Sequence, residues 1–267
     1  MLRVKLSVVY AVALMTAALG LGGCSTPVDK TATMSPNAIY AEAKDSADSG
    51  QYDKAIPLYE KLEARAAGTP LAQQAQLEKA YAQYRTQEPA QAIATLDRFM
   101  KLHPASPALD YAMYLKGIIN FNDDLGLFSA ISRQDLSERD QKASKEAFES
   151  FKELVARFPN SRYTPDATQR MNYIVGSLAQ YEVHVARYYY KRGAYLAAVN
   201  RAQTAVADYR DVPAVEEAMF IIYKSYDALG LTKLRDDAKR IMETNYPNSE
   251  FLTKGERTSN DPWWKLW

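Results

Sequence analysis

Few residues in this chain of 267 have side chains suited to chemistry. Cys24 is the only cysteine, so its thiol cannot form an internal disulfide. The two histidines, His103 and His184, have no second His and no Cys at the spacing of a metal site. The sequence also contains no phosphate-binding, dinucleotide-binding or GxSxG nucleophile motif. We therefore predict no metal, no cofactor and no catalytic residue, and we expect Cys24 to carry a covalent modification.

The segment before Cys24 has the parts of a secretory signal peptide. Arg3 and Lys5 give a basic start, residues 6–23 carry no charge, and the segment ends in small residues. A membrane-spanning helix is the alternative, but this run is near the lower length limit for one. The three residues that end this segment form, together with the cysteine, the sequence Leu21-Gly22-Gly23-Cys24, which is similar to the bacterial lipobox.

The lipobox resemblance implies that the chain is cleaved before Cys24. It further implies S-diacylglycerol on the thiol and N-palmitoyl on the new amino group, and several acyl chains together anchor a protein stably. Residue 25 is Ser rather than Asp, which in lipoproteins favours the outer membrane over the inner one. We thus expect a signal peptide over residues 1–23 and a lipidated, polar tether over residues 24–35.

The composition of the remaining chain argues against a nucleic-acid partner. Removal of Arg3 and Lys5 leaves 33 − 2 = 31 basic residues against 32 acidic ones, a formal charge of −1. Nucleic-acid-binding domains are usually strongly basic. With 24% charged and 47% hydrophobic residues, the body is expected to be soluble and folded.

Prolines that follow Ser or Thr mark candidate helix starts along the chain. Ser and Thr can cap the free N–H groups of a first turn, and Pro fits the first helical position. Pro36 and Pro70 are 34 residues apart, as are Pro213 and Pro247, and 34 is the period of the tetratricopeptide (TPR) repeat. The predicted caps are Ser35-Pro36, Thr69-Pro70, Ser106-Pro107 and Thr164-Pro165, with weaker ones at Val212-Pro213 and Tyr246-Pro247.

Small residues recur where two helices of such a repeat must pack closely. They are Ala55, Ala92, Ala147 and Ala198, while Ala238 leaves the register of a fifth repeat uncertain. We predict an all-α fold, an α-solenoid of five TPR-like helix pairs. Repeats 1–2 occupy residues 36–106 and repeats 3–5 occupy residues 107–252, followed by a tail over residues 253–267.

Two repeats depart from the compact pattern. In repeat three, Gly117 lies near the close-contact position, and residues 122–140 are expected to form a long loop. In repeat four, residues 165–193 form a long first helix that should stack on repeat three. Carboxylates in the expected loop could serve a glycan hydrolase, but nearby arginines favour a solvated, ion-paired loop. These residues are Asp123, Asp124, Glu138 and Asp140, with Arg133 and Arg139.

The lipobox, tether and helical repeats together resemble the BamD (ComL) family of the outer-membrane β-barrel assembly (Bam) machine. Three stretches carry the resemblance: LDYAMYLKG at 109–117, RQDLSERD leading into AFESFKELVARFPNSRY at 133–163, and YEVHVARYYYKRGAYLAAVNR at 181–201. The resemblance implies a non-enzymatic scaffold whose C-terminal repeats bind the last periplasmic domain of BamA. It also implies that the N-terminal repeats receive unfolded outer membrane β-barrel substrates, and that lipoproteins of the BamC and BamE type join.

Within this resemblance, Arg201 corresponds to an arginine that faces an acidic residue of BamA. A guanidinium suits such a contact because its planar fork pairs with a carboxylate in two hydrogen bonds. A solvated helix arginine is the alternative. The stretch at 186–195, ARYYYKRGAY, could stack on bases, but core packing on one face and a protein contact on the other fit a neutral chain better.

The sequence differs from the family pattern in two places. Residues 64–72, ARAAGTPLA, replace an aromatic turn implicated in substrate contact, so that site is not transferred to this chain. Residues 261–267, DPWWKLW, form an added tail that either packs on the last repeat or docks in a groove of this protein or a partner.

Two other functions stay open at this point. One is a periplasmic repeat adaptor that organises the cell wall or division. The other is a wall-cleaving enzyme on a helical solenoid, which would need an acidic residue in a substrate cleft.

Overall fold

A computed structural model describes residues 30–132 and 141–254 of the chain, and only the backbone at 30, 122–132 and 254. A short 3-10 helix covers Lys30–Thr33. The α-helices are α2 (Pro36–Asp48), α3 (Tyr52–Arg65), α4 (Pro70–Arg85), α5 (Pro89–Leu102), α6 (Leu109–Ser132), α7 (Lys142–Arg157), α8 (Thr164–Lys191), α9 (Tyr195–Asp208), α10 (Ala214–Ala228), α11 (Thr232–Asn245) and α12 (Glu250–Lys254). The described residues contain no strand.

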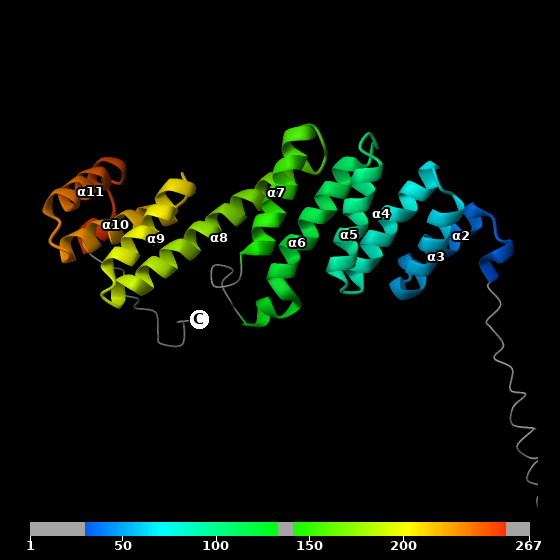
Figure 1. Ribbon diagram of the computed structural model, residues 1–267, viewed down its shortest axis with the longest axis horizontal. Helices are drawn as coiled ribbons and strands as arrows, with labels where there is room; N and C mark the ends of the chain where they lie inside the picture. Colours follow the sequence, from blue (N-terminus) through cyan, green and yellow to red (C-terminus); the bar gives the residue numbers. More distant parts are fainter. Residues whose placement is uncertain (1–29, 133–140, 255–267) are drawn as a thin grey trace, which may run out of the picture.

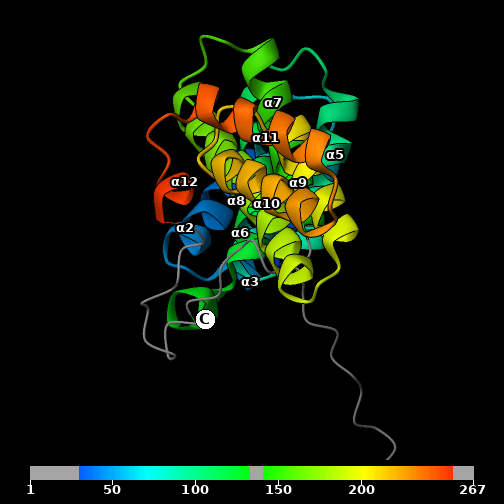
Figure 2. The same ribbon diagram turned by 90° about the vertical axis from the view of Figure 1, so that its left-hand side faces the viewer.

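Helices α2 to α11 form five antiparallel pairs stacked side by side into an elongated array (Figure 1). Each helix packs mainly on its neighbours in the sequence, and the short α12 lies against α10. The view from the α11 end shows the successive pairs lined up behind one another (Figure 2). The predicted all-α solenoid of five TPR-like pairs is confirmed, because each pair buries its core only against adjacent helices.

The second helices of the five pairs share one register. Each carries a fully buried residue whose carbonyl accepts a hydrogen bond from the N–H of the residue that caps the helix four positions later. The buried residues and their caps are Leu62 and Ala66, Phe99 and His103, Leu154 and Phe158, Ala205 and Tyr209, and Met242 and Tyr246. Equivalent positions in α3, α5, α7, α9 and α11 can therefore be compared directly.

The predicted close-contact alanines lie seven residues before this buried position. Ala55, Ala92, Ala147 and Ala198 are each fully buried, as their role requires. In α11 the equivalent residue is Arg235 and not Ala238, which settles the register that the sequence left uncertain. The Arg235 guanidinium reaches Asp227 at the end of α10, with 3.3 Å between Nη1 and Oδ1, and keeps its charge partly in solvent.

Two of the predicted helix caps form as expected. The Ser35 Oγ accepts from the Ala38 N–H at 3.3 Å, and the Thr69 Oγ1 accepts from the Ala72 N–H at 3.3 Å. The cap predicted at Thr164 is wrong, because Thr164 is the first residue of α8. Its hydroxyl instead donates to the Phe158 carbonyl at 2.7 Å, which ties the start of α8 to the end of α7.

The loop predicted over residues 122–140 is also wrong for its first part. Helix α6 runs without interruption to Ser132, so Asp123 and Asp124 are helical. Single Asn, Asp and Gly residues each cost a helix no more than about 1 kcal/mol, too little to end one already nucleated. The remainder of the predicted loop, with Glu138 and Asp140, lies outside the described residues.

Helix α8 is long, as predicted, and joins two parts of the core. Its N-terminal half packs Ile174 and Leu178 against α6 and α7. Its C-terminal half packs Val183 and Ala186 against α9 and α10. One continuous helix therefore links repeat three to repeats four and five.

Gly117 allows α6 and α7 to approach closely. A Cβ atom there would lie 2.6 Å from Cδ1 and 2.8 Å from Cζ of the fully buried Phe151 ring. Such contacts are shorter than any side chain tolerates without displacement. The predicted close-contact role of Gly117 is confirmed.

Candidate partner-binding surface

Arg201 lies on α9, in the fourth helix pair. The alanines Ala198, Ala202 and Ala205 of the same helix are fully buried against α8 and α10. Arg201 lies at the border of this apolar face, and 46% of its side chain is exposed. The helix therefore presents a guanidinium to solvent from a rigidly packed base.

The partner of Arg201 within the chain is Glu182 of α8. The Arg201 Nη1 lies 3.2 Å from the Glu182 Oε2, and only 9% of the Glu182 side chain is exposed. Glu182 shares a helix face with the buried Leu178 and Ala186, so its carboxylate sits in an otherwise apolar row. A carboxylate in such a place requires a charged or hydrogen-bonding partner. Glu182 thereby holds the Arg201 guanidinium in place without removing it from solvent.

Helices α8, α9 and α10 carry further polar and aromatic contacts. The Arg187 Nε lies 2.6 Å from the Glu217 Oε1, which ties α8 to α10. The Gln203 Nε2 donates to the Tyr226 hydroxyl at 3.2 Å. Tyr189 packs on the core, whereas Tyr188 is exposed. This agrees with the expectation that residues 186–195 divide between a core face and an outer face.

A second feature is a tyrosine-lined cleft where repeat two meets repeat three. It has a volume of about 530 Å³ and lies between α4, the start of α6 and the turn before α8. The rings of Tyr114 and Tyr163 stack with 4.6 Å between their centroids, and Tyr111 packs at 5.7 Å from Tyr163. The Arg162 guanidinium lies 4.7 Å over the Tyr163 ring. Burial, with the nearby Glu78 carboxylate, raises the pKa of Tyr111 to about 12, so its hydroxyl stays protonated.

Repeats one and two are joined by a polar cluster centred on Glu63. This carboxylate accepts from Gln76 at 2.6 Å, from the buried Lys79 at 3.1 Å and from Arg98 at 2.7 Å. Burial alone would raise the pKa of Glu63, but these hydrogen bonds and the two cations outweigh it and hold that pKa below its usual value. The cluster fixes α3, α4 and α5 relative to one another.

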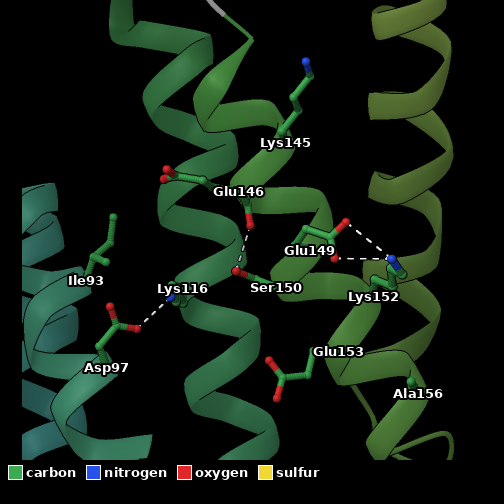
Figure 3. A pocket seen from close by; sticks show the side chains of 10 residues that line it. All are labelled: Ile93, Asp97, Lys116, Lys145, Glu146, Glu149, Ser150, Lys152, Glu153 and Ala156. Carbon is green, nitrogen blue, oxygen red and sulfur yellow. Dashed lines mark hydrogen bonds and ion pairs between the residues drawn. The ribbon is translucent and has the colours of Figure 1, made fainter. Parts of the chain in front are cut away.

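A larger groove, of about 770 Å³, opens between α5, α6 and α7 (Figure 3). Its lining is mostly charged, and Lys116 pairs with Asp97 at 2.6 Å while Lys152 pairs with Glu149 at 3.3 Å. Figure 3 shows these pairs on the wall of the groove. Ion pairs of this exposed kind contribute little energy and belong to a solvated surface.

The two histidines belong to different repeats. His103 caps the end of α5, with its ring 5.1 Å from that of Phe99, and His184 is exposed on α8. Over residues 30–132 and 141–254, no group of three or more His, Cys, Asp or Glu residues is arranged to hold a metal ion. In the same part of the chain no helix combines the length and the apolar character that crossing a membrane demands. Cys24 and the tail at 261–267 lie outside the described residues.

The turn between α3 and α4 contains the residues that differ from the family pattern. Ala66 is buried there, and Gly68 adopts the left-handed conformation with φ of 79°. Neither residue has an aromatic side chain, so the aromatic turn that the resemblance implied is absent at these positions.

Sequence reasoning missed the role of Glu182. The sequence does contain a signal for it: Glu182 lies four residues after Leu178 and four before Ala186, so an acidic residue interrupts the apolar face of a helix. The tyrosine cleft was also missed, because Tyr111 and Tyr163 come from segments that are far apart in the sequence.

These features define a class: an α-solenoid binding protein of the TPR type, with a fixed arginine on its C-terminal half. The family follows from comparison with known proteins. A family model named YfiO, described as an outer membrane lipoprotein, matches residues 32–241. "Outer membrane protein assembly factor BamD" of Neisseria meningitidis serogroup B is 45% identical over 262 residues, which is 95% of this chain and 98% of the relative. The chain belongs to this family, the BamD family of outer membrane lipoproteins.

A more distant relative agrees with this assignment. The protein of the same name from Vibrio cholerae serotype O1 is 33% identical and covers 84% of this chain and 93% of the relative. The solved TPR-like repeats of a kinesin light chain of Podosopora anserina are 17% identical, covering 80% of this chain and 96% of that chain. Their TM-score is 0.34, so the fold assignment rests on the helix arrangement itself.

Proposed function

We propose that this chain is a non-catalytic scaffold that helps to deliver and insert β-barrel proteins at the outer membrane. The broad role follows from family membership: the chain is an outer membrane protein assembly factor of the BamD type. As the subunit of a Bam complex, it holds its partners in place through surfaces of a rigid helical array.

The attachment proposed for the array is a lipid anchor on Cys24. The signal-like residues 1–23 and the lipobox support cleavage and acylation there, and Ser25 supports outer-membrane delivery. The proposed tether over residues 24–35 would keep the first helix pair close to the periplasmic face of that membrane. Its last part is not free chain, because Lys30–Thr33 form a 3-10 helix and Arg65 Nη1 donates to the Met34 carbonyl at 3.2 Å. Several acyl chains suffice for stable attachment without a spanning helix.

The proposed BamA contact is the surface around Arg201, within residues 107–252. The observation that carries it is the half-exposed guanidinium held by the nearly buried Glu182. Such a preorganised cation loses little conformational freedom when it binds a carboxylate, which favours association. The partner surface would be an acidic patch on the periplasmic part of BamA, and BamC- and BamE-type lipoproteins would bind elsewhere on the array.

Residues 36–106 are proposed to receive unfolded β-barrel substrates. The tyrosine cleft borders this half, at the junction of α4 with α6. Aromatic side chains offer a large contact area at low conformational cost, which suits extended and varied segments. The alternative of a cell-wall or division adaptor draws no support from the comparisons.

The experiment that tests this proposal is co-purification from solubilised outer membrane. An affinity-tagged wild-type chain should retain a large β-barrel protein with periplasmic domains, together with smaller lipoproteins. Capture of peptidoglycan-associated or division proteins without any β-barrel protein would overturn the proposal and favour the adaptor.

A further inference from the structure

The last helix of the array, α11, exposes apolar residues on one face. Leu231, Leu234 and Ile241 are 43%, 45% and 42% exposed. Leu234 and Ile241 lie seven residues apart, two turns of α11, so they share one side of the helix, and Leu231 is the residue that caps its start. We call these three residues the α11 stripe. Single exposed leucines are ordinary, but a row of this kind signals a surface that something covers.

The stripe is absent from the first three repeats, and in α9 the residues equivalent to Leu234 and Ile241 are Ala197 and Thr204. In the common register, the positions of Leu234 and Ile241 are filled by polar or charged residues in α3, α5 and α7. These are Lys54 and Lys61, Gln91 and Arg98, and Glu146 and Glu153. The outer side of the second helix is therefore polar in these three repeats and apolar in the last one.

A sixth helix pair does not explain this face. In each second helix, the fully buried residue that defines the common register (Met242 in α11) serves as the reference. The next pair packs on the residues six positions before and one position after it. In α5, α7 and α9 both positions are apolar, and in α3 they are Ile56 and Glu63, whereas in α11 both are acidic, Asp236 and Glu243. The apolar residues are Ile93 and Met100, Phe148 and Val155, and Val199 and Val206. Helix α11 thus ends the array with a polar stacking face, as terminal repeats must.

The chain itself supplies a suitable occupant. Helix α12 holds the chain beside α10 and α11, because the Phe251 ring stacks on Phe220 with 5.4 Å between centroids and shares a cluster with Met242. Residues 255–267 follow directly and can reach about 43 Å at roughly 3.3 Å per residue. Helix α11, with 14 residues, is only about 21 Å long at 1.5 Å per residue. A segment attached this closely competes strongly with any free partner.

The composition of this segment matches the stripe. All three tryptophans of the chain, Trp263, Trp264 and Trp267, occur in it, together with Leu266. Large aromatic and aliphatic side chains gain the most free energy when they leave water and cover an apolar surface. We propose that residues 261–267 pack on the α11 stripe and complete the last helix pair. The inference goes beyond the proposed function, because it concerns a contact within the chain and needs no partner.

Fluorescence excited where tyrosine does not absorb tests this inference directly, since every tryptophan of the chain lies in the tail. The tryptophan emission of the purified wild-type chain should be shifted to short wavelength, and acrylamide should quench it weakly. Both properties should be independent of protein concentration. The variant Leu234→Lys with Ile241→Lys places on α11 the residues that α3 tolerates at the same positions. It should lose the protection completely and emit like free tryptophan. The control Leu196→Lys, at the exposed leucine of α9, should behave like wild type.

Three results would overturn the inference. They are wild-type tryptophans as accessible as free tryptophan, protection that persists in the double lysine variant, and protection that depends on protein concentration, which would indicate a second copy. If the double variant loses helical structure, hydrogen exchange of a chain ending at Lys254 decides instead. Amides of α11 should then exchange faster than in the whole chain while those of α3 do not change, and equal exchange in α11 would overturn the inference.

Discussion

Arg201 of α9 and Glu182 of α8 form an ion pair at the edge of the core, with 3.2 Å between Nη1 and Oε2. The carboxylate is nearly buried and the guanidinium is half exposed, so the two partners have unequal roles. Glu182 orients the Arg201 guanidinium, which remains available to donate hydrogen bonds to a second carboxylate. The same pair therefore bears on both the stability of the fourth repeat and the proposed contact with BamA.

The first prediction concerns stability. Arg201→Ala leaves the Glu182 carboxylate without its charged partner, so the free energy of unfolding should fall by about 1–3 kcal/mol. The double variant Glu182→Gln with Arg201→Ala should recover part of this loss, because a neutral amide is less costly to bury. Urea denaturation of the three proteins measures both effects. Equal stability of wild type and Arg201→Ala would show that the pair does not hold the two helices.

The second prediction concerns the closest helix contact. Gly117→Ala should destabilise the protein by about 1–3 kcal/mol, because the added methyl overlaps the buried Phe151 ring. Gly176→Ala is the matched control, since a Cβ atom at this helical glycine of α8 meets nothing within 4 Å. It should leave stability unchanged or raise it by up to about 1 kcal/mol. Thermal unfolding curves that move equally for both variants would refute the close-contact role.

The third prediction concerns pH. The pKa of Glu63 is lower in the folded chain than its ordinary value of 4.5, so its ionised form stabilises the fold. This contribution is fully present above the ordinary pKa and disappears as the pH falls through the lower, folded-state pKa. Glu63→Gln should thus cost about 1–3 kcal/mol at neutral pH. The difference from wild type should shrink on acidification below pH 4.5, and a gap that stays constant would contradict the assignment.

The fourth prediction concerns membrane attachment. Cys24→Ser should abolish incorporation of labelled palmitate and release of the signal peptide at this position, because serine lacks the thiol to be acylated. Ser25→Asp is the matched variant, which should keep the label but move the protein to the inner-membrane fraction. Palmitate labelling that survives Cys24→Ser would contradict the proposal that Cys24 carries the lipid.

Much of the fold could be predicted from local sequence features. The close-contact alanines and Gly117 identified the helix pairs, because tight packing leaves room only for small residues there. The end of α6 was mispredicted, because Asn, Asp and Gly weaken a helix without ending it. The α11 register was left uncertain, because the alanine signal is absent where Arg235 stands. Contacts such as Arg201 with Glu182 join different helices and become visible only when the chain is folded.

The central claim is that the Arg201 surface binds the periplasmic part of BamA. The most direct measurement is the affinity of the purified BamA periplasmic domains for Glu182→Gln and for Glu182→Gln with Arg201→Glu. The Glu182→Gln background shared by both variants removes repulsion between two neighbouring carboxylates, so a change in affinity reports on the surface charge. Arg157→Glu on α7 is the control, because that arginine has 44% side-chain exposure and a local partner in Glu153.

The account predicts binding at least about tenfold weaker when Arg201 is reversed, since a close interfacial charge pair is worth about 1.5 kcal/mol or more. Arg157→Glu should bind like wild type. Equal affinity of the Glu182→Gln chain with and without Arg201→Glu would contradict the account.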